Sequence, residues 1–165
     1  MRALLLVPCA LATLACAPGA RPPANDGLQV AADTLRGRVA IVGSEPGTWV
    51  VLQLDGGRRA VTLLGDRRVL DRLSGLEATV WGTPDASGML PVTRFEVRGS
   101  GGVAAVDGVL ERRGGGYVLV THEGRALPLA HLPEALREAV GGRVWLAGPL
   151  DRPPDSFGVL SEPAR

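Results

Sequence analysis

Two histidines are the side chains of this sequence best suited to acid–base or metal chemistry. His122 ends an apolar run, "YVLVTH", and His131 directly precedes "LPEALREAV", where a helix is expected. A metal or general-base site would need both, together with a nearby acidic residue. The sequence has no serine nucleophile elbow, phosphate-binding loop, paired-histidine helix or calcium-loop pattern. We therefore predict two solvated histidines, no catalytic or metal site and no cofactor. The alternative is a hydrolase or metal enzyme with its site across the two halves of the chain.

Arginines and aromatic side chains are the candidates for recognition. Five arginines cluster around a predicted strand and helix of the first half; we expect a solvated face, with an anion-binding patch as the alternative: Arg58, Arg59, Arg67, Arg68 and Arg72. Four aromatic residues alternate with apolar residues in predicted strands. We expect Trp81 and Trp145 on the exterior or at the contact between the halves, and Trp49 and Tyr117 at the rim or half-exposed. The alternative is that these aromatic rings form a ligand-binding face and stack against the ligand: Trp49, Trp81, Tyr117 and Trp145.

The N-terminal residues carry the most specific signal. A single arginine precedes an apolar stretch over 3–15, which is too short to cross a bilayer and is typical of a secretory signal. The stretch ends in "LATLAC", which resembles the lipobox of bacterial lipoproteins, with Thr13 in place of the more usual leucine. The resemblance implies cleavage before Cys16 and lipidation of that cysteine. An ordinary signal peptide, cut near Ala17 or Ala20, is the alternative.

These residues set the expected location of the chain. We expect residues 1–15 to be the signal, and the Pro-, Ala- and Gly-rich residues 16–34 to be a flexible tether. Several acyl chains would anchor the protein stably in a membrane. Ala17 follows the cysteine where an aspartate would suggest retention in the inner membrane, so we expect the outer membrane, facing the periplasm.

Charge indicates which partners are unsuitable. The chain has 18 basic residues, all of them arginine, against 17 acidic residues. A nucleic-acid-binding protein usually has a basic excess, so we expect no nucleic-acid partner. The expected partners are the membrane, through the lipid, and an envelope protein or glycan.

The two halves of the chain resemble each other. "WVVLQLDGG" and "YVLVTHEGR" each run from an aromatic residue through an apolar stretch and an acidic residue to glycine. Four further matched pairs occur in the same order in both halves, the first of them before the quoted segments: Gly37 with Gly108, Leu70 with Leu136, Gly75 with Gly141, and Gly82 with Gly148. We interpret this as a duplication, with repeats at 35–98 and 105–162 and a linker at 99–104. A single continuous sheet through 98–105 would overturn the duplication.

Each repeat is predicted to be mainly β with one short helix. Apolar runs bounded by Gly, Pro or Asp predict five strands per repeat: 36–43, 48–55, 59–64, 76–82 and 91–97, then 105–112, 116–122, 125–130, 143–148 and 156–161. Helical spacing predicts helices over 67–74 and after Pro133. Three strands, a helix and two strands resemble the OB-fold, a small five-stranded barrel, in element order and length. We therefore expect two tandem OB-like barrels; an SH3-like barrel and a single β-sandwich are the alternatives.

The same pattern predicts which side chains are buried. We expect the core of the first repeat to contain Val50, Leu52, Leu70, Leu73 and Val80, and that of the second to contain Val118, Val120, Leu136, Val140 and Leu146. Small barrels bury little surface, so the two should pack on each other, with Trp81 or Trp145 near the contact. The function expected is that of a non-enzymatic, membrane-anchored envelope lipoprotein, a binding or assembly module.

Overall fold

The computed structural model describes residues 34–44 and 47–163 of the chain. The predicted signal, Cys16 and nearly all of the predicted tether lie outside the described residues. Within those residues the chain is mainly β with short helices, as predicted, and no helix there is long and apolar enough to cross a membrane.

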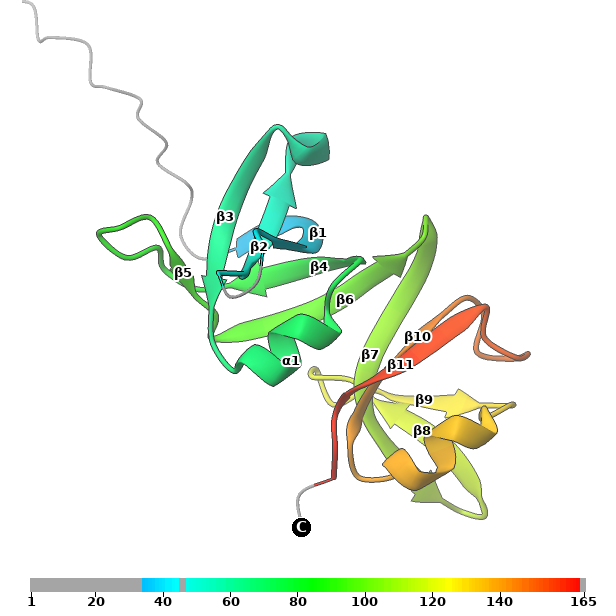
Figure 1. Ribbon diagram of the computed structural model, residues 1–165. Helices are drawn as coiled ribbons and strands as arrows, with labels where there is room; N and C mark the ends of the chain where they lie inside the picture. Colours follow the sequence, from blue (N-terminus) through cyan, green and yellow to red (C-terminus); the bar gives the residue numbers. More distant parts are fainter. Residues whose placement is uncertain (1–33, 45–46, 164–165) are drawn as a thin grey trace, which may run out of the picture.

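The first half contains six strands and one α-helix (Figure 1). In chain order they are β1 (Thr34–Val42), β2 (Trp49–Leu54), the 3-10 turn η1 (Asp55–Gly57), β3 (Arg59–Leu64), α1 (Arg67–Arg72), β4 (Leu76–Trp81), β5 (Leu90–Pro91) and β6 (Arg94–Ser100). Asp66 caps α1 by accepting a hydrogen bond from the Arg68 N–H, as its place before the helix predicts.

The second half repeats this order with a shorter final region. Its elements are β7 (Val103–Arg113), β8 (Gly116–Val120), β9 (Ala126–Leu129), the 3-10 helix η2 (Glu134–Ala139), β10 (Arg143–Ala147) and β11 (Ser156–Ser161). The predicted helix after Pro133 is therefore a 3-10 helix. Leu136 and Ala139 are its buried residues, and they are three apart, which matches the repeat of that tighter helix.

Strand pairing follows one order in both halves. The first half runs β3-β2-β1-β4-β6, and the second runs β9-β8-β7-β10-β11, with every neighbouring pair antiparallel. In the first half β5 also pairs in parallel with β3. The two halves therefore share one order of strand pairing.

The glycine-rich segment between the halves is a hairpin rather than a linker. β6 pairs with β7 through Gly99 with Ala104 and Ser100 with Val103, and Gly101 and Gly102 turn the chain with positive φ. One sheet therefore continues through 98–105 from the first half into the second and is open. The prediction of two tandem barrels is not confirmed, and by the criterion given above this continuous sheet counts against the duplication. A pair of glycines with positive φ favours a tight hairpin turn, which here joins β6 to β7.

Two glycine pairs have matching geometry in the two halves. A Cβ on Gly37 would lie 2.2 Å from the carbonyl oxygen of Gln53, and a Cβ on Gly108 would lie 2.4 Å from that of Val120. No side chain fits at either place, because the first and second strands of each half approach too closely. Gly75 and Gly141 have φ of +85° and +87°. The Gly75 N–H donates to the carbonyl oxygen of Val39, and the Gly141 N–H donates to that of Leu110. Each acceptor is two residues after Gly37 or Gly108.

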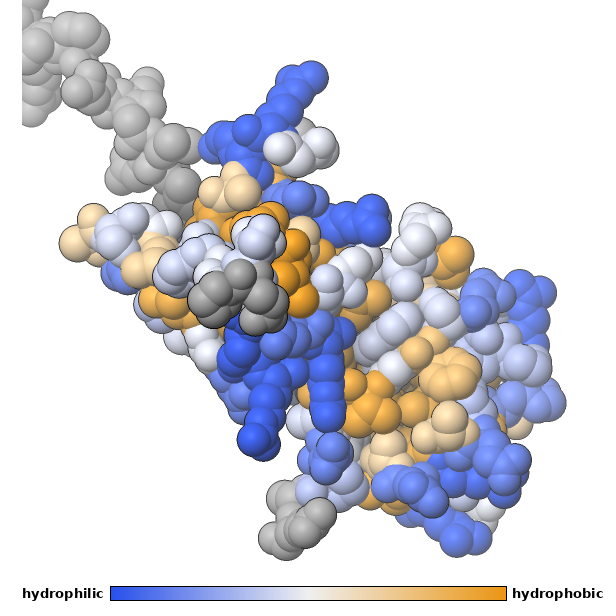
Figure 2. Space-filling view, viewed as in Figure 1, coloured by the Kyte–Doolittle hydropathy of each residue, from blue (hydrophilic) through white to orange (hydrophobic). Residues whose placement is uncertain are grey.

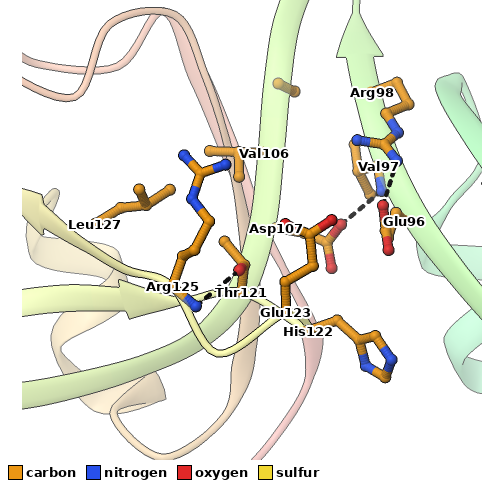
Figure 3. Close-up of a pocket in the computed structure, with 11 residues that line it drawn as sticks. Glu96, Val97, Arg98, Val106, Asp107, Thr121, His122, Glu123, Arg125 and Leu127 are labelled. Atoms are coloured by element: carbon orange, nitrogen blue, oxygen red, sulfur yellow. Dashed lines mark hydrogen bonds and ion pairs between the residues drawn. The ribbon is translucent and has the colours of Figure 1, made fainter.

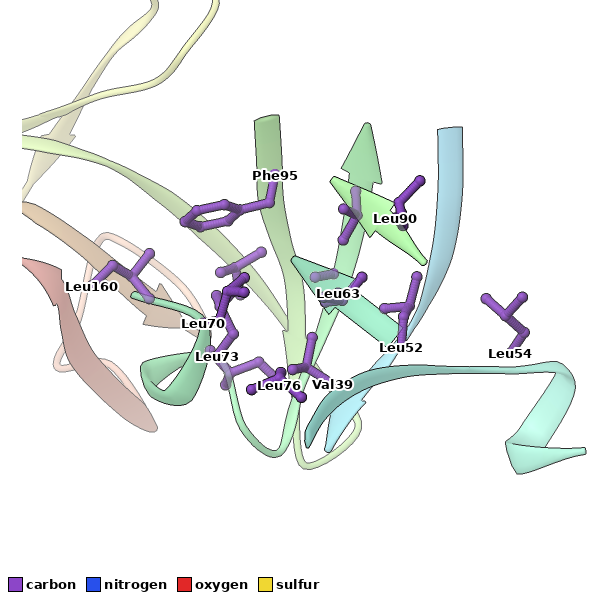
Figure 4. Packing of buried hydrophobic residues seen from close by; sticks show 14 residues of the cluster. Val39, Leu52, Leu54, Leu63, Leu70, Leu73, Leu76, Leu90, Phe95 and Leu160 are labelled. Atoms are coloured by element: carbon purple, nitrogen blue, oxygen red, sulfur yellow. The ribbon is translucent and has the colours of Figure 1, made fainter. Parts of the chain in front are cut away.

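The buried side chains form two clusters, one in each half. The five core residues predicted for the first half are all buried, which confirms that part of the pattern. Figure 4 shows that Leu160, from β11, lies with Leu70 and Leu73 in the first cluster. Trp145 and Ala105 pack against the same cluster, so the second half completes the core of the first.

The second cluster departs from prediction on β8. Leu136 and Leu146 are buried and Val140 packs against them, but Val118 and Val120 are only half-buried. Leu119 is buried instead, because it pairs with Leu110 on the core face of β7. The prediction aligned Trp49 with Tyr117, whereas the contacts of Gly37 and Gly108 align Leu52 with Leu119. That difference of one residue turns every side chain of a strand to the other face.

Candidate functional site

A buried ion pair holds the junction between the two halves. Asp107, on β7, is 6% exposed and accepts hydrogen bonds from the Val97 N–H at 2.6 Å and from Arg143 Nε at 2.7 Å. Arg143, on β10, also donates through Nη2 to the carbonyl oxygen of Phe95 at 2.6 Å. Its guanidinium carbon lies 4.0 Å from the centre of the Phe95 ring. Two residues of the second half therefore bind the backbone and a ring of β6.

Burial dominates the electrostatics of this pair. Loss of water raises the pKa of the Asp107 carboxyl above its ordinary value, although the charge of Arg143 and the Val97 N–H oppose that shift. The charges of this pair therefore add little to the stability of the fold, since the desolvation of the two ions offsets their attraction. Its hydrogen bonds fix the position of β10 relative to β6.

A small cavity lies beside this ion pair and contains one of the two histidines. It has a volume of about 100 Å³, and its lining includes Glu96, Asp107, His122, Glu123 and Arg125 (Figure 3). In Figure 3 the imidazole of His122 points away from Asp107. His122 also lines a second cavity, of about 300 Å³, next to Phe95 and Arg143.

The second histidine is elsewhere. His131 is exposed after β9 and lines neither cavity. Over residues 34–44 and 47–163, no three His, Cys, Asp or Glu side chains are grouped so that they could hold a metal ion. The two histidines predicted as candidates for one site are therefore not brought together.

The four aromatic residues occupy four different environments. Trp145 is half-buried at the junction, where it packs against the first core cluster. Trp81 lies under the guanidinium of Arg94, its cross-strand neighbour, whose carbon is 3.6 Å from the ring centre. Tyr117 packs against the second cluster. Trp49, by contrast, is 53% exposed.

The five arginines predicted as a possible patch lie at two separate places. Arg58 and Arg59 adjoin the β2–β3 turn, whereas Arg67, Arg68 and Arg72 belong to α1, beyond the far end of β3. A six-residue strand spans roughly 20 Å. Figure 2 shows hydrophilic surface at both places, where Figure 1 has the β2–β3 turn and α1. Arg67 and Arg72 are also paired, with Asp71 and Glu162.

An exposed apolar surface lies at the β1–β2 hairpin end. Trp49 and Val42 are direct cross-strand partners, and Ile41 precedes Val42. Their exposed fractions are 53%, 38% and 43%. Arg67 of α1 donates hydrogen bonds to the carbonyl oxygen and the hydroxyl of Thr48, at 2.9 and 2.8 Å, and so attaches this hairpin end to the helix. Ile41 pairs with Val50 and leaves the core-facing side of the hairpin, whereas Val42 and Trp49 leave the opposite side. We name Val42 and Trp49 the hairpin-end patch.

Sequence reasoning missed both the junction pair and the hairpin-end patch as a unit. Asp107 and Arg143 are far apart in the chain, and neither stands in a motif. Only the matched glycines carried a usable signal, because they fix which strand residues correspond in the two halves. Trp49 was recognised as a candidate, but its apolar neighbours on β1 were not.

The fold and these contacts define a mainly β chain whose halves share one order of strand pairing and are joined through a buried ion pair. Comparison of the chain with protein-family models, with curated proteins and with solved structures finds no match.

Proposed function

We propose that this protein is a non-enzymatic, membrane-anchored envelope lipoprotein of two tandem OB-like units, which acts as a binding or assembly module. The lipobox-like residues ending at Cys16 support the anchor. The order of three strands, a helix and two strands, with the same pairing in both halves, supports the two OB-like units.

The hairpin-end patch is the observation that carries the binding role. It accounts for two of the five large hydrophobic side chains that are exposed in the described part of the chain. Contiguous exposed apolar side chains mark interaction sites, and tryptophan is the side chain most often found at the energetic centre of an interface. We infer that a protein of the envelope binds here, with Trp49 as its main anchor.

The patch is presented on a fixed element, which favours binding. The core-facing side of the same hairpin is buried through Val39, Val50 and Leu52, and Arg67 holds Thr48. A side chain on a rigid element loses little further conformational freedom when it enters an interface.

Site-specific photocrosslinking in the living cell tests this function. A photoreactive residue placed at Trp49 should give a discrete adduct with an envelope protein, and Trp49→Ala should abolish binding of that protein. Gly116 is the matched control, because the alignment of Leu52 with Leu119 places it where Trp49 lies in the other half. Adducts that are absent at Trp49, or that are the same at both positions, would contradict the proposal.

An envelope hydrolase is the second candidate function. Its support is that His122 lines the same cavity as Glu96, Asp107 and Glu123. This candidate requires turnover of an envelope substrate that His122→Ala removes and His131→Ala leaves unchanged. Binding of a partner at Trp49 with no such turnover favours the first candidate.

A further inference from the structure

The junction pair has a counterpart in the first half in which the two charges are exchanged. Gly37 pairs with Ala78 on β4, and Gly108 pairs with Val144 on β10. In the first half, Arg36 precedes Gly37 and Glu77 precedes Ala78. In the second half, Asp107 precedes Gly108 and Arg143 precedes Val144. Arg36 thus corresponds to Asp107, and Glu77 to Arg143.

The two charged side chains form an ion pair in the second half but not in the first. Asp107 and Arg143 are in contact at 2.5 Å and lie against β6. Arg36 and Glu77, by contrast, make no hydrogen bond or ion pair with each other, nor does Arg38 with either, among the residues that the structure describes. A Cβ on Gly99 would lie 3.0 Å from Glu77 Oε2, so this carboxylate lies over Gly99 of β6.

The two unpaired arginines face a concave part of the sheet. Arg36, Arg38, Gln53 and Glu77 line a cavity of about 470 Å³, together with the backbone of Gly56 and Gly57 in the β2–β3 turn. Both of these glycines have positive φ, and nothing lies within 4 Å of where their Cβ atoms would be. A ligand can therefore approach the turn closely.

The spacing of the arginines indicates what they would bind. Arg36 and Arg38 lie two residues apart on β1, so their side chains leave the same face with Cα atoms roughly 7 Å apart. A carboxylate has two oxygens in one plane and matches a single guanidinium. A phosphate group is tetrahedral and offers oxygens to both guanidinium groups at once.

We propose that this outer face of the first half, which we name the arginine cavity, binds a phosphate group of a soluble ligand between Arg36 and Arg38. The Gln53 amide is placed to donate a further hydrogen bond. Glu77 also lines the cavity, and its negative charge limits the affinity. The proposal does not depend on the partner proposed for the hairpin-end patch, because Trp49 and Gln53 lie at opposite ends of β2.

Titration followed by NMR tests the arginine cavity in the purified full chain, held in a non-ionic detergent. The probes are inorganic phosphate and tripolyphosphate. We expect saturable shifts confined to the residues that line the cavity, including the side-chain Nε–H signals of Arg36 and Arg38. Arg36→Ala and Arg38→Ala should each weaken tripolyphosphate binding about tenfold or more, whereas Glu77→Gln should strengthen it severalfold.

Arg112→Ala is the matched control, because Arg112 is also an exposed arginine on a strand. It should bind tripolyphosphate as the unchanged protein does. Shifts that spread over all arginines, or that Arg112→Ala reduces equally, would overturn the proposal. Binding to phosphatidylglycerol vesicles without binding to either soluble phosphate would also overturn it, and would make this face a membrane contact.

Discussion

Replacement of Asp107 separates the contribution of its charge from that of its hydrogen bonds. Because burial raises the pKa of this carboxyl, the folded chain holds the proton more tightly than the unfolded chain does. Its contribution to stability is therefore fully present below the pKa of the unfolded chain and is lost as the pH rises through the folded pKa. Asp107→Asn keeps an oxygen that accepts from the Val97 N–H but carries no charge.

The two variants of Asp107 should differ strongly at pH 7. We expect Asp107→Asn to change the free energy of unfolding by less than about 1 kcal/mol, since desolvation already offsets the attraction to Arg143. Asp107→Ala leaves the buried Val97 N–H and the Arg143 guanidinium without this acceptor. An unsatisfied buried donor costs about 1–3 kcal/mol, and Arg143, whose side chain is 26% exposed, adds roughly 1 kcal/mol. The total is about 2–4 kcal/mol, a fall in Tm of roughly 6–15 °C for a chain of this size.

Urea unfolding between about pH 4 and pH 8 measures these effects, with tryptophan fluorescence as the signal. The unchanged protein should lose stability relative to Asp107→Asn as the pH rises. Asp151→Asn, at an exposed position, is the control and should show no such trend. If Asp107→Asn is as unstable as Asp107→Ala at pH 7, the ionised charge itself stabilises the junction and the reasoning is refuted.

Two further predictions concern the tight strand approach and the lipid anchor. Gly37→Ala and Gly108→Ala should each lower the free energy of unfolding by at least about 2 kcal/mol, because the new Cβ would meet a backbone oxygen at 2.2 or 2.4 Å. Gly116→Ala, with only one contact at 3.8 Å, should have little effect in the same denaturation assay; equal losses at all three would contradict the packing argument. Cys16→Ser should abolish lipidation and release the protein from membranes in a fractionation experiment. A variant that stays in the membrane fraction after a salt wash would show that the lipobox interpretation is wrong.

The sequence by itself determined the mainly β class, the order of the elements and the buried face of the first half. Alternation of apolar residues and the glycines at strand and helix ends are local signals, so they act before any tertiary contact forms. Gly37 and Gly108 also show how a matched pair in the sequence reports a matched geometry. The buried face of β8 was predicted wrongly because Tyr117, within this strand, gave a register one residue away from that of the glycines.

Only the tertiary structure decided how the two halves meet. Leu160 enters the core of the first half, and Asp107 and Arg143 bind β6, although no local pattern distinguishes them from ordinary strand residues. The same holds for the arginines: sequence proximity grouped Arg58 with Arg67, but β3 separates them. Residues adjacent in sequence diverge along a strand, whereas residues from distant strands become neighbours through pairing, and that pairing is fixed by the whole sheet.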